Sequence, residues 1–294
     1  MAYLELSAEM EQSIALACQD TLESLGALAV SLLDAGDNPL LEPLPGTTPL
    51  WQSVKVVGLF AEHVSYLEIN EQLKARFPHI AFQYQRLDDQ DWTRAWLAHF
   101  KPMHFGNRLW VMPHEYPNPL ELSMNAVILK LDPGLAFGTG THPTTALCLT
   151  WLAQQNLQQK TLIDYGCGSG ILGIAGLLLG AKEVYGVDYD PQALIASRDN
   201  AQRNDIVDEA LKTILPQEMP SISADCIMAN ILANPLIELA PVLSSHAKPG
   251  CDLILSGLLT DQADAVQAAY RPWFRFEKSW VDEDWVLLIA QRLL

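Results

Sequence analysis

The chain has 294 residues, of which 49% are hydrophobic, and its formal net charge is -17. This apolar content excludes a disordered chain, and the length is sufficient for two domains. So acidic a surface repels phosphate backbones, which argues against nucleic acid as a direct partner and favours a basic protein, although the same charge would also keep the protein soluble without any such partner.

The five cysteines are widely spaced and form no Cys-x-x-Cys pair, so the sequence predicts neither a disulfide framework nor a metal site. Residues 1–10 lack the basic cluster of a signal peptide. The longest apolar stretch, Ile171–Leu179, is too short to cross a bilayer. We therefore expect a cytoplasmic monomer with no bound metal and no membrane association.

Residues 1–88 are expected to form a small α+β domain. The spacing of apolar residues predicts elements in the order β-α-β-β-α-β, namely Ala2–Ser7, Glu9–Leu25, Ala27–Leu33, Ser53–Phe60, His63–Arg76 and Ile80–Leu87. This order is typical of a ferredoxin-like split unit. Because no catalytic motif occurs in it, we expect the domain to bind or to position a partner.

Residues 89–104 are expected to link this domain to the rest of the chain. Acidic residues at positions 88–91 precede an expected helix at Trp92–Phe100, and their charges suit the positive end of a helix dipole. The alternative is that this helix simply packs on one of the two domains.

Residues 105–294 alternate between strands and helices, which predicts an α/β domain with a doubly wound parallel sheet and helices on both faces. The expected elements are Leu109–Met112, Ala126–Leu131, a helix from Pro143, Thr161–Asp164, Leu172–Gly180, Glu183–Val187, Pro191–Asn204, Leu211–Leu215, Asp225–Asn230, Pro235–Ser244, Cys251–Ser256 and Gln262–Tyr270. Two aromatic-rich segments at the end, Trp273–Trp280 and Trp285–Gln291, predict an antiparallel hairpin.

The strand at Thr161–Asp164 is followed at once by a turn that contains Gly166, Gly168 and Gly170. Glycines let a ligand approach the main chain closely, and the N-terminus of the following helix offers N–H groups to an anionic group. Asp188 closes the next strand, where a carboxylate accepts the hydroxyl groups of a ribose. This order predicts a nucleoside ligand at the carboxyl edge of the sheet.

Two cofactors are compatible with this turn. Gly168, Gly170 and Gly173 match the Gly-x-Gly-x-x-Gly pattern of dinucleotide-binding enzymes, with Asp188 at the expected distance, so NAD is one of the two. The other is S-adenosylmethionine. Asp164 favours it, because a carboxylate repels a pyrophosphate but attracts a methionyl ammonium or a sulfonium group. The terminal hairpin also favours the methyltransferase form of the fold.

The segment Met228–Pro235 ends the fourth strand of this sheet, on the edge that would face the reacting methyl group. An asparagine there, together with nearby carbonyl groups, can accept N–H bonds from an amine and direct its lone pair. We interpret Asn230 as this residue. Asn234 precedes a proline, and we interpret it as a helix N-cap.

The segment Asp132–Thr145 is rich in glycine and threonine and precedes a helix, which is typical of a loop that folds over a ligand. The alternative is a plain connection in which Thr141 or Thr144 caps the helix. His142 is a conceivable general base in this loop, although a single loop histidine often has no catalytic role.

Four stretches together resemble the PrmA family, the methyltransferases of the bacterial large-subunit ribosomal protein L11: Leu135–Thr145, Asp164–Gly170, Gly186-Val187-Asp188 and Ala229-Asn230-Ile231-Leu232. The most specific part is Phe-Gly-Thr-Gly-Thr-His-Pro-Thr-Thr, and the resemblance spans nearly the whole chain. It implies a class I S-adenosylmethionine-dependent methyltransferase domain fused to a ferredoxin-like substrate-recognition domain. It also implies repeated methylation of the α-amine and of lysine side chains on one basic ribosomal protein.

The resemblance further implies which residues form the site. The residues that contact the cofactor would be Thr145, Gly166, Asp188 and Asn230, with Phe137 and Thr141 near the methyl donor. We add Asp164 and Gly168 from the glycine turn to the cofactor residues, and we expect Asn230 to position the amine. Residues 211–217 lack the acidic residue that some methyltransferases place after the third strand, so adenine recognition is not assigned there.

Overall fold

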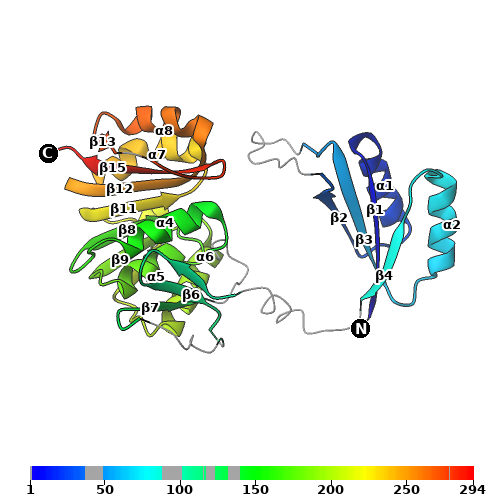
Figure 1. The fold of residues 1–294 in the computed structure, drawn as a ribbon, viewed down its shortest axis with the longest axis horizontal. Helices are drawn as coiled ribbons and strands as arrows, with labels where there is room; N and C mark the ends of the chain where they lie inside the picture. The colour runs from blue at the N-terminus through cyan, green and yellow to red at the C-terminus, as the bar shows by residue number, and fades with distance from the viewer. Residues whose placement is uncertain are drawn as a thin grey trace. The chain divides into compact units, whose positions relative to one another are not determined.

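The computed structural model describes residues 2–36, 49–87, 101–114, 116, 123–131, 140–277 and 279–294. The chain divides into two compact units, Met1–Ala95 and Trp96–Leu294 (Figure 1). The helix expected at Trp92–Phe100 lies outside the described residues. At the end of the predicted linker, the short strand β5 (Met103–Phe105) begins, and it belongs to the second unit.

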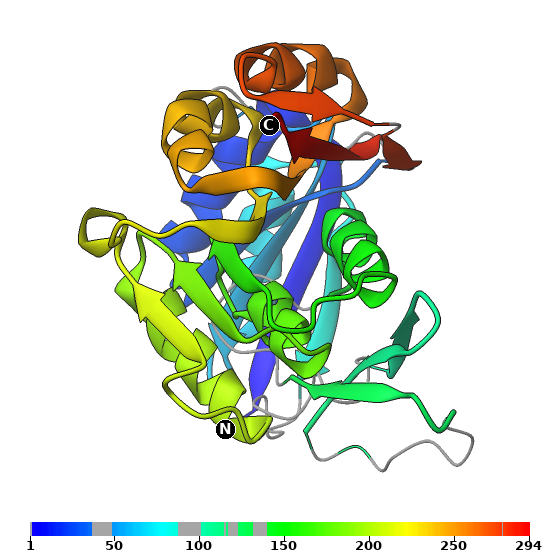
Figure 2. The same cartoon turned by 90° about the vertical axis from the view of Figure 1, so that its left-hand side faces the viewer.

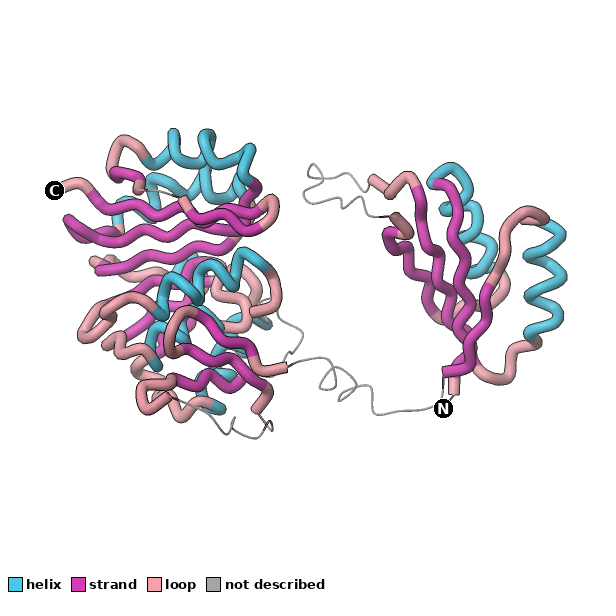
Figure 3. The backbone as a smooth tube through the Cα atoms, in the orientation of Figure 1, coloured by secondary structure: helices cyan, strands magenta, loops and turns pink. Residues whose placement is uncertain are grey.

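The first unit contains six elements in the predicted order β-α-β-β-α-β. They are β1 (Tyr3–Glu11), α1 (Gln12–Ser24), β2 (Ala29–Asp34), β3 (Ser53–Ala61), α2 (Tyr66–Arg76) and β4 (Gln83–Leu87). All strand pairs are antiparallel, and the strand order is β2-β3-β1-β4 (Figure 1). Figure 3 shows the strands of this unit in magenta and its helices in cyan. The likeness to ferredoxin-like proteins stays a prediction.

The core of the first unit lies between one face of this sheet and the two helices. Leu6, Val56 and Phe60 point from the strands toward Leu22 of α1 and Leu73 of α2, and all five side chains are fully buried. The expected boundary between the first strand and helix was wrong. The strand continues to residue 11 because residues 9–11 pair with residues 53–55 of β3, and a helix cannot form while the backbone makes those bonds.

The second unit is built on an eight-stranded sheet in the order β10-β9-β8-β11-β12-β15-β13, with β14 paired to β15. The first five of these strands are parallel: β8 (Thr161–Tyr165), β9 (Glu183–Val187), β10 (Leu211–Ile214), β11 (Ala224–Asn230) and β12 (Ala247–Leu259). The predicted doubly wound parallel sheet is therefore confirmed.

The terminal antiparallel strand β15 (Trp285–Arg292) lies between β12 and the short strand β13 (Phe274–Phe276). The single strand expected at Trp273–Trp280 is instead two strands, β13 and β14 (Trp280–Asp282). The register explains the break. Phe276 pairs with Ala290 and Trp280 pairs with Leu287, so one strand has an extra residue that cannot pair.

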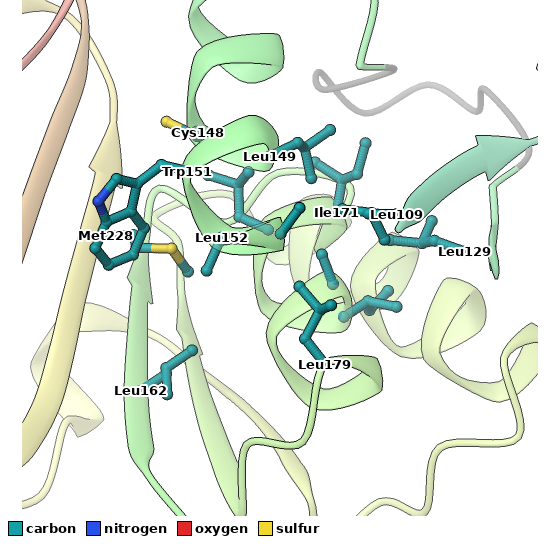
Figure 4. Close-up of a cluster of buried hydrophobic side chains, with 14 of the residues drawn as sticks. Leu109, Leu129, Cys148, Leu149, Trp151, Leu152, Leu162, Ile171, Leu179 and Met228 are labelled. Atoms are coloured by element: carbon teal, nitrogen blue, oxygen red, sulfur yellow. The ribbon is translucent and has the colours of Figure 1, made fainter. Parts of the chain in front are cut away.

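Helices cover both faces of the sheet (Figure 2). The five helices of the second unit in the described residues are α4 (Pro143–Ala153), α5 (Ile171–Leu178), α6 (Pro191–Arg203), α7 (Ala233–Ser245) and α8 (Ala263–Tyr270). On one face, Leu162 and Met228 of the sheet pack with Leu149 and Leu152 of α4 (Figure 4). On the other face, the next residues along the strands pack with α7 and α8. This alternation follows from the two-residue period of a strand.

A small sheet of β5, β6 (Leu109–Met112) and β7 (Val127–Lys130) packs beside α4 and α5. Its residues Leu109 and Leu129 pack in the same hydrophobic core as the apolar side chains of α4 (Figure 4). The strands β6 and β7 match the sequence prediction, whereas β5 falls in the stretch that was expected to be linker. No helix within the described ranges is long and apolar enough to span a bilayer.

Candidate functional site

The glycine-rich turn lies between β8 and α5, at the carboxyl edge of the parallel sheet. Gly166, Gly168 and Gly170 have φ angles of 77°, 53° and 79°, a conformation that residues with a Cβ adopt at a cost. The backbone N of Gly166 donates to the carbonyl of Val187 at 2.7 Å, which ties the start of the turn to the end of β9. The turn therefore presents bare backbone beside the end of the neighbouring strand.

Asp164 is the penultimate residue of β8, just before this turn, and its side chain is only 2% exposed. Its Oδ2 accepts a hydrogen bond from the backbone N of Gly173, at 2.8 Å, in the first turns of α5. The pKa of this carboxyl is raised from 3.8 to about 7. Burial is the main cause, the Gly173 N–H opposes the rise, and the negative charge of Asp188 adds to it. The carboxyl therefore has a structural role in joining β8 to α5, in addition to any role toward a ligand.

Asp188 follows β9 and is half-buried. Its Oδ2 accepts from the backbone N of Gly168 at 2.9 Å, and its Oδ1 accepts from the backbone N of Asp190 at 3.0 Å. An ionised carboxylate has about four acceptor positions, so both oxygens keep the capacity to accept further hydrogen bonds. The structure thus brings two of the predicted cofactor residues, Asp188 and Gly168, into direct contact.

Ile231 follows β11 and occupies the space that two glycines leave open. A Cβ built on Gly166 would lie 2.3 Å from Cγ2 of Ile231, and a Cβ built on Gly257 would lie 2.5 Å from its carbonyl oxygen. The backbone N of Ile231 also donates to Ser256 O at 3.1 Å. These contacts of Ile231 hold the end of β11, and with it the adjacent residue Asn230, next to the glycine turn.

Asn230 contacts Thr145, another predicted cofactor residue. Its Nδ2 donates to Thr145 Oγ1 at 3.1 Å, across 85 positions of sequence. Thr145 is in the first turn of α4 and is 4% exposed. Since Nδ2 is used in this bond, Oδ1 is the amide group left to accept an N–H. The contact therefore fixes the orientation of the Asn230 amide.

His142 is the N-cap of α4, so neither Thr141 nor Thr144 caps this helix, as the alternative interpretation of the loop had them do. The imidazole Nδ1 lies 3.3 Å from the backbone N of Thr144 and 2.7 Å from its Oγ1. The ring also meets Trp285 edge-on, at 4.7 Å between centroids, and burial lowers the pKa of the imidazole from 6.5. These contacts give His142 a structural role as the cap of the helix.

The other predictions in this part of the chain have different outcomes. Phe137 lies outside the described residues, and Thr141 is exposed immediately before the cap. Asn234 is not a helix cap as expected. The helix α7 begins at Ala233, two residues before the predicted start at Pro235, and its N-cap is Leu232 without a side-chain bond. The early start is possible because Pro235, at the third position, needs no hydrogen-bond partner for its nitrogen.

Two residues that hold the glycine turn were not foreseen from the sequence. Ser197 and Asn200 on α6 both donate side-chain hydrogen bonds to carbonyl groups of the turn. The signal available in the sequence was two polar residues, three positions apart, on the apolar face that Leu194 and Ala201 define. Among the described residues, no cluster of histidine, cysteine or acidic side chains is arranged to hold a metal ion.

These features fit the nucleoside part of S-adenosylmethionine. The turn lies at the carboxyl edge of the parallel sheet, and a half-buried carboxylate lies beside it, which is the arrangement that nucleoside-binding folds of this kind use. The parallel sheet closes with an antiparallel strand between β12 and β13. Fold and site together define the class as class I S-adenosylmethionine-dependent methyltransferases, and they do not favour the dinucleotide-binding alternative.

Comparison with known proteins gives the family. The family described as "Ribosomal protein L11 methyltransferase (PrmA)" matches residues 2–293, and the chain belongs to it. A relative named ribosomal protein L11 methyltransferase from Hahella chejuensis is 51% identical over 296 residues, which cover 100% of this chain and 99% of the relative. One of the same name from Methylococcus capsulatus is 48% identical over 98% of both chains.

A solved structure agrees with this assignment. The crystal structure of a ribosomal protein L11 methylase from Lactobacillus delbrueckii subsp. bulgaricus is 32% identical to this chain, with a TM-score of 0.60. The match covers 66% of this chain and 100% of that one. The resemblance found in the sequence motifs is therefore confirmed.

Proposed function

We propose that this protein transfers methyl groups from S-adenosylmethionine to amino groups of ribosomal protein L11, both lysine side chains and the α-amine. The observation that carries the proposal is the bond between Asn230 and Thr145 beside the glycine turn. It supports a site in which the Asn230 Oδ1 accepts an N–H of the amine, so that the nitrogen lone pair points toward the methyl group.

The proposed cofactor residues surround this point. We assign the backbone at Gly166 and Gly168 to contact with the cofactor, Asp188 to the ribose hydroxyls and Asp164 to the methionyl ammonium. Thr145 would hold Asn230 and adjoin the cofactor. Two further residues, Phe137 and Thr141, are assigned near the methyl donor on family resemblance alone.

The amine must be neutral to react. A lysine with a pKa of ~10.4 loses its proton near pH 7 at a cost of about 4 to 5 kcal/mol. Water would take up this proton before the transfer. S-adenosylmethionine would supply the methyl group to the neutral nitrogen, with S-adenosylhomocysteine as the leaving group. Because His142 is a helix cap, no strong base among the described site residues is assigned to the amine. Catalysis is expected from orientation and partial desolvation.

The first unit is proposed to recognise the substrate protein. Residues 1–95 contain 14 acidic and 5 basic side chains, so a third of the chain carries a net charge of -9 out of -17. Glu5 and Glu9 of β1 alternate with Leu6 and Ala8, which are buried under the helices, so the glutamates lie on the opposite face of the sheet. An acidic sheet face is suited to a lysine-rich protein. We also propose a cytoplasmic location, because a ribosomal substrate would be present there.

A labelling experiment tests the proposed function. The protein is incubated with methyl-labelled S-adenosylmethionine and a mixture of ribosomal proteins, ribosomal RNA and small metabolites. We expect label on L11, and mass spectrometry of the labelled protein then identifies the modified amines and the number of methyl groups on each. Label on RNA or on a metabolite, with none on L11, would contradict the proposal.

A further inference from the structure

Two buried side chains of α6 bind consecutive carbonyl groups of the glycine turn. Ser197 Oγ donates to Gly168 O at 2.9 Å, and Asn200 Nδ2 donates to Ser169 O at 2.9 Å. The two side chains are 0% and 4% exposed, respectively. One helix therefore holds two adjacent peptide groups of the turn in a fixed direction.

The orientation of the Asn200 amide is itself determined by a neighbour. Arg203 Nη1 lies 3.1 Å from Asn200 Oδ1, and a guanidinium group can only donate. Oδ1 is thus the acceptor in that bond, and Nδ2 faces Ser169 O. The bond from Arg203 therefore fixes the orientation of the Asn200 amide, so that its NH2 group is the donor to the turn.

The turn also packs against α6 without a gap. A Cβ on Gly170 would lie 2.9 Å from the Ser197 hydroxyl oxygen, which is shorter than real Cβ contacts, and 3.1 Å from the Ser197 Cα, which is tighter than most of them. Backbone and helix therefore meet directly at this point. The hydrogen bonds from Ser197 and Asn200 additionally orient the peptide groups of the turn that lie against this helix.

The orientation of these peptide groups has to be fixed by other residues, because the glycines allow the backbone of the turn to adopt several conformations. A peptide group between glycine residues can rotate among several conformations at little cost. In a trans peptide the N–H points opposite to the C=O, so holding the carbonyls of Gly168 and Ser169 toward α6 turns the following N–H groups away from that helix. Without the two donors, the turn would lose the constraint that selects one arrangement.

We propose that Ser197 and Asn200 are positioning residues for the cofactor. They set the peptide groups of the glycine turn in their binding arrangement before the cofactor arrives, so that binding does not have to order them. The inference rests on the proposed assignment of the turn and of Asp188 to the cofactor. Its consequence is specific: loss of either donor weakens cofactor binding and leaves turnover at saturating cofactor unchanged.

The sharpest test is Asn200→Asp, which keeps the shape of the side chain and replaces the donor with an acceptor. Calorimetry of the full chain with S-adenosylhomocysteine should show a dissociation constant raised about tenfold, the effect of one lost hydrogen bond to a buried carbonyl. KM for S-adenosylmethionine should rise by a similar factor, and kcat should stay within about twofold.

Asn204→Asp is the matched control on the same helix. The Asn204 amide accepts from Lys130 N at 2.8 Å and donates to Lys130 O at 2.7 Å. Its Nδ2 also donates to the main-chain carbonyl of Asn200 at 2.8 Å, so Asn204 binds β7 and the backbone of its own helix and makes no bond to the turn. This control should lower the melting temperature at least as much as Asn200→Asp, with a dissociation constant for S-adenosylhomocysteine within about twofold of the unmodified protein. Equal weakening in both variants would show that only general stability is involved and would overturn the inference.

A second variant, Ser197→Ala, tests the same inference if Asn200→Asp does not fold. It removes one oxygen atom, and Ser244→Ala is its control because Ser244 is a buried serine on α7 that donates to a carbonyl of its own helix, Ala240 O. We expect weaker cofactor binding only for Ser197→Ala. Asp188→Ala is measured in parallel: if it binds normally, the proposed cofactor site is wrong, whereas normal binding by the Ser197 and Asn200 variants alone refutes the positioning role.

Discussion

The carboxylate of Asp188 accepts a hydrogen bond from the backbone N of Gly168 at 2.9 Å, and this bond fastens the end of β9 to the turn that follows β8. The second carboxylate oxygen binds the backbone N of Asp190, the N-cap of α6. One side chain thus joins three segments of the edge where the ligand is expected. A substitution here affects the shape of the turn as well as any bond to a ribose.

We expect Asp188→Ala to weaken binding of S-adenosylhomocysteine by ~1.5–3 kcal/mol, because the ribose hydroxyls and the Gly168 N–H both lose their acceptor. Asp188→Asn keeps one acceptor oxygen and should weaken binding less. Calorimetry measures both. Asp208→Ala, an exposed aspartate beyond α6, is the control that should bind normally. Unchanged binding by Asp188→Ala would contradict the assignment of Asp188 to the ribose hydroxyls.

The stability of the protein is expected to fall as the pH rises from about 4 to about 7 because of Asp164. Burial raises the pKa of this carboxyl from 3.8 to about 7. Over this interval the folded protein keeps a proton that the unfolded chain has released. The contribution of this proton to stability is therefore complete at low pH and is lost as the pH rises through the pKa of Asp164 in the folded protein. The free energy of unfolding should fall by an amount on the order of 2–4 kcal/mol.

Asp164→Asn should flatten this dependence, because an amide oxygen still accepts the Gly173 N–H and carries no charge. Urea unfolding between about pH 5 and about pH 8 measures it. Asp225→Asn is the control: burial alone would raise the pKa of Asp225, but hydrogen bonds from Thr161 N and Lys248 lower it, so this group loses its contribution only at more acidic pH. An unchanged slope in Asp164→Asn would contradict the assignment.

Gly166→Ala is expected to destabilise the protein and to abolish cofactor binding. The new methyl group would overlap Ile231 and would also force alanine into a positive φ of 77°. Gly250→Ala separates the two effects, because Gly250 has the same φ of 77° with nothing within 4 Å of the added Cβ. We expect a loss of about 1–2 kcal/mol for Gly250→Ala and about 1–3 kcal/mol more for Gly166→Ala in urea unfolding. Equal losses would mean that the contact with Ile231 is unimportant.

Thr145→Val is expected to lower kcat about tenfold, because the amide of Asn230 loses the acceptor that orients it. Valine has nearly the same shape as threonine, so the packing of α4 should be preserved. Thr145→Ser keeps the hydroxyl and should retain most of the activity. Steady-state methylation of L11 measures both variants, and full activity of the valine variant would show that this hydrogen bond does not serve the reaction.

Neutralising Glu5 and Glu9 to glutamine is expected to raise KM for L11 about three- to tenfold without changing KM for S-adenosylmethionine. The effect should shrink at high salt, where surface charges are screened. The control neutralises Asp20 and Glu23, two exposed acidic residues of α1 on the side of the unit away from this sheet face. An equal effect in the control would indicate that only total charge matters.

The predicted elements of the second unit agree with the structure wherever the signal was local. The strand at 161–164, the glycine turn and the strand at 183–187 are each set by residues next to one another in the chain. By contrast, the expected break between the first strand and helix failed because residues 9–11 pair with β3, more than forty positions away. The break between β13 and β14 likewise follows from their register on β15.

The sequence alone determined the class of the protein and the position of the glycine turn, because glycines, strand and following carboxylate lie within a single stretch of the chain. Only the tertiary structure decided how the site is held together. Thr145 meets Asn230 across 85 positions, and Asn200 meets Ser169 across 31. Such bonds depend on where packed helices point their side chains, and a local pattern of residues does not contain that direction.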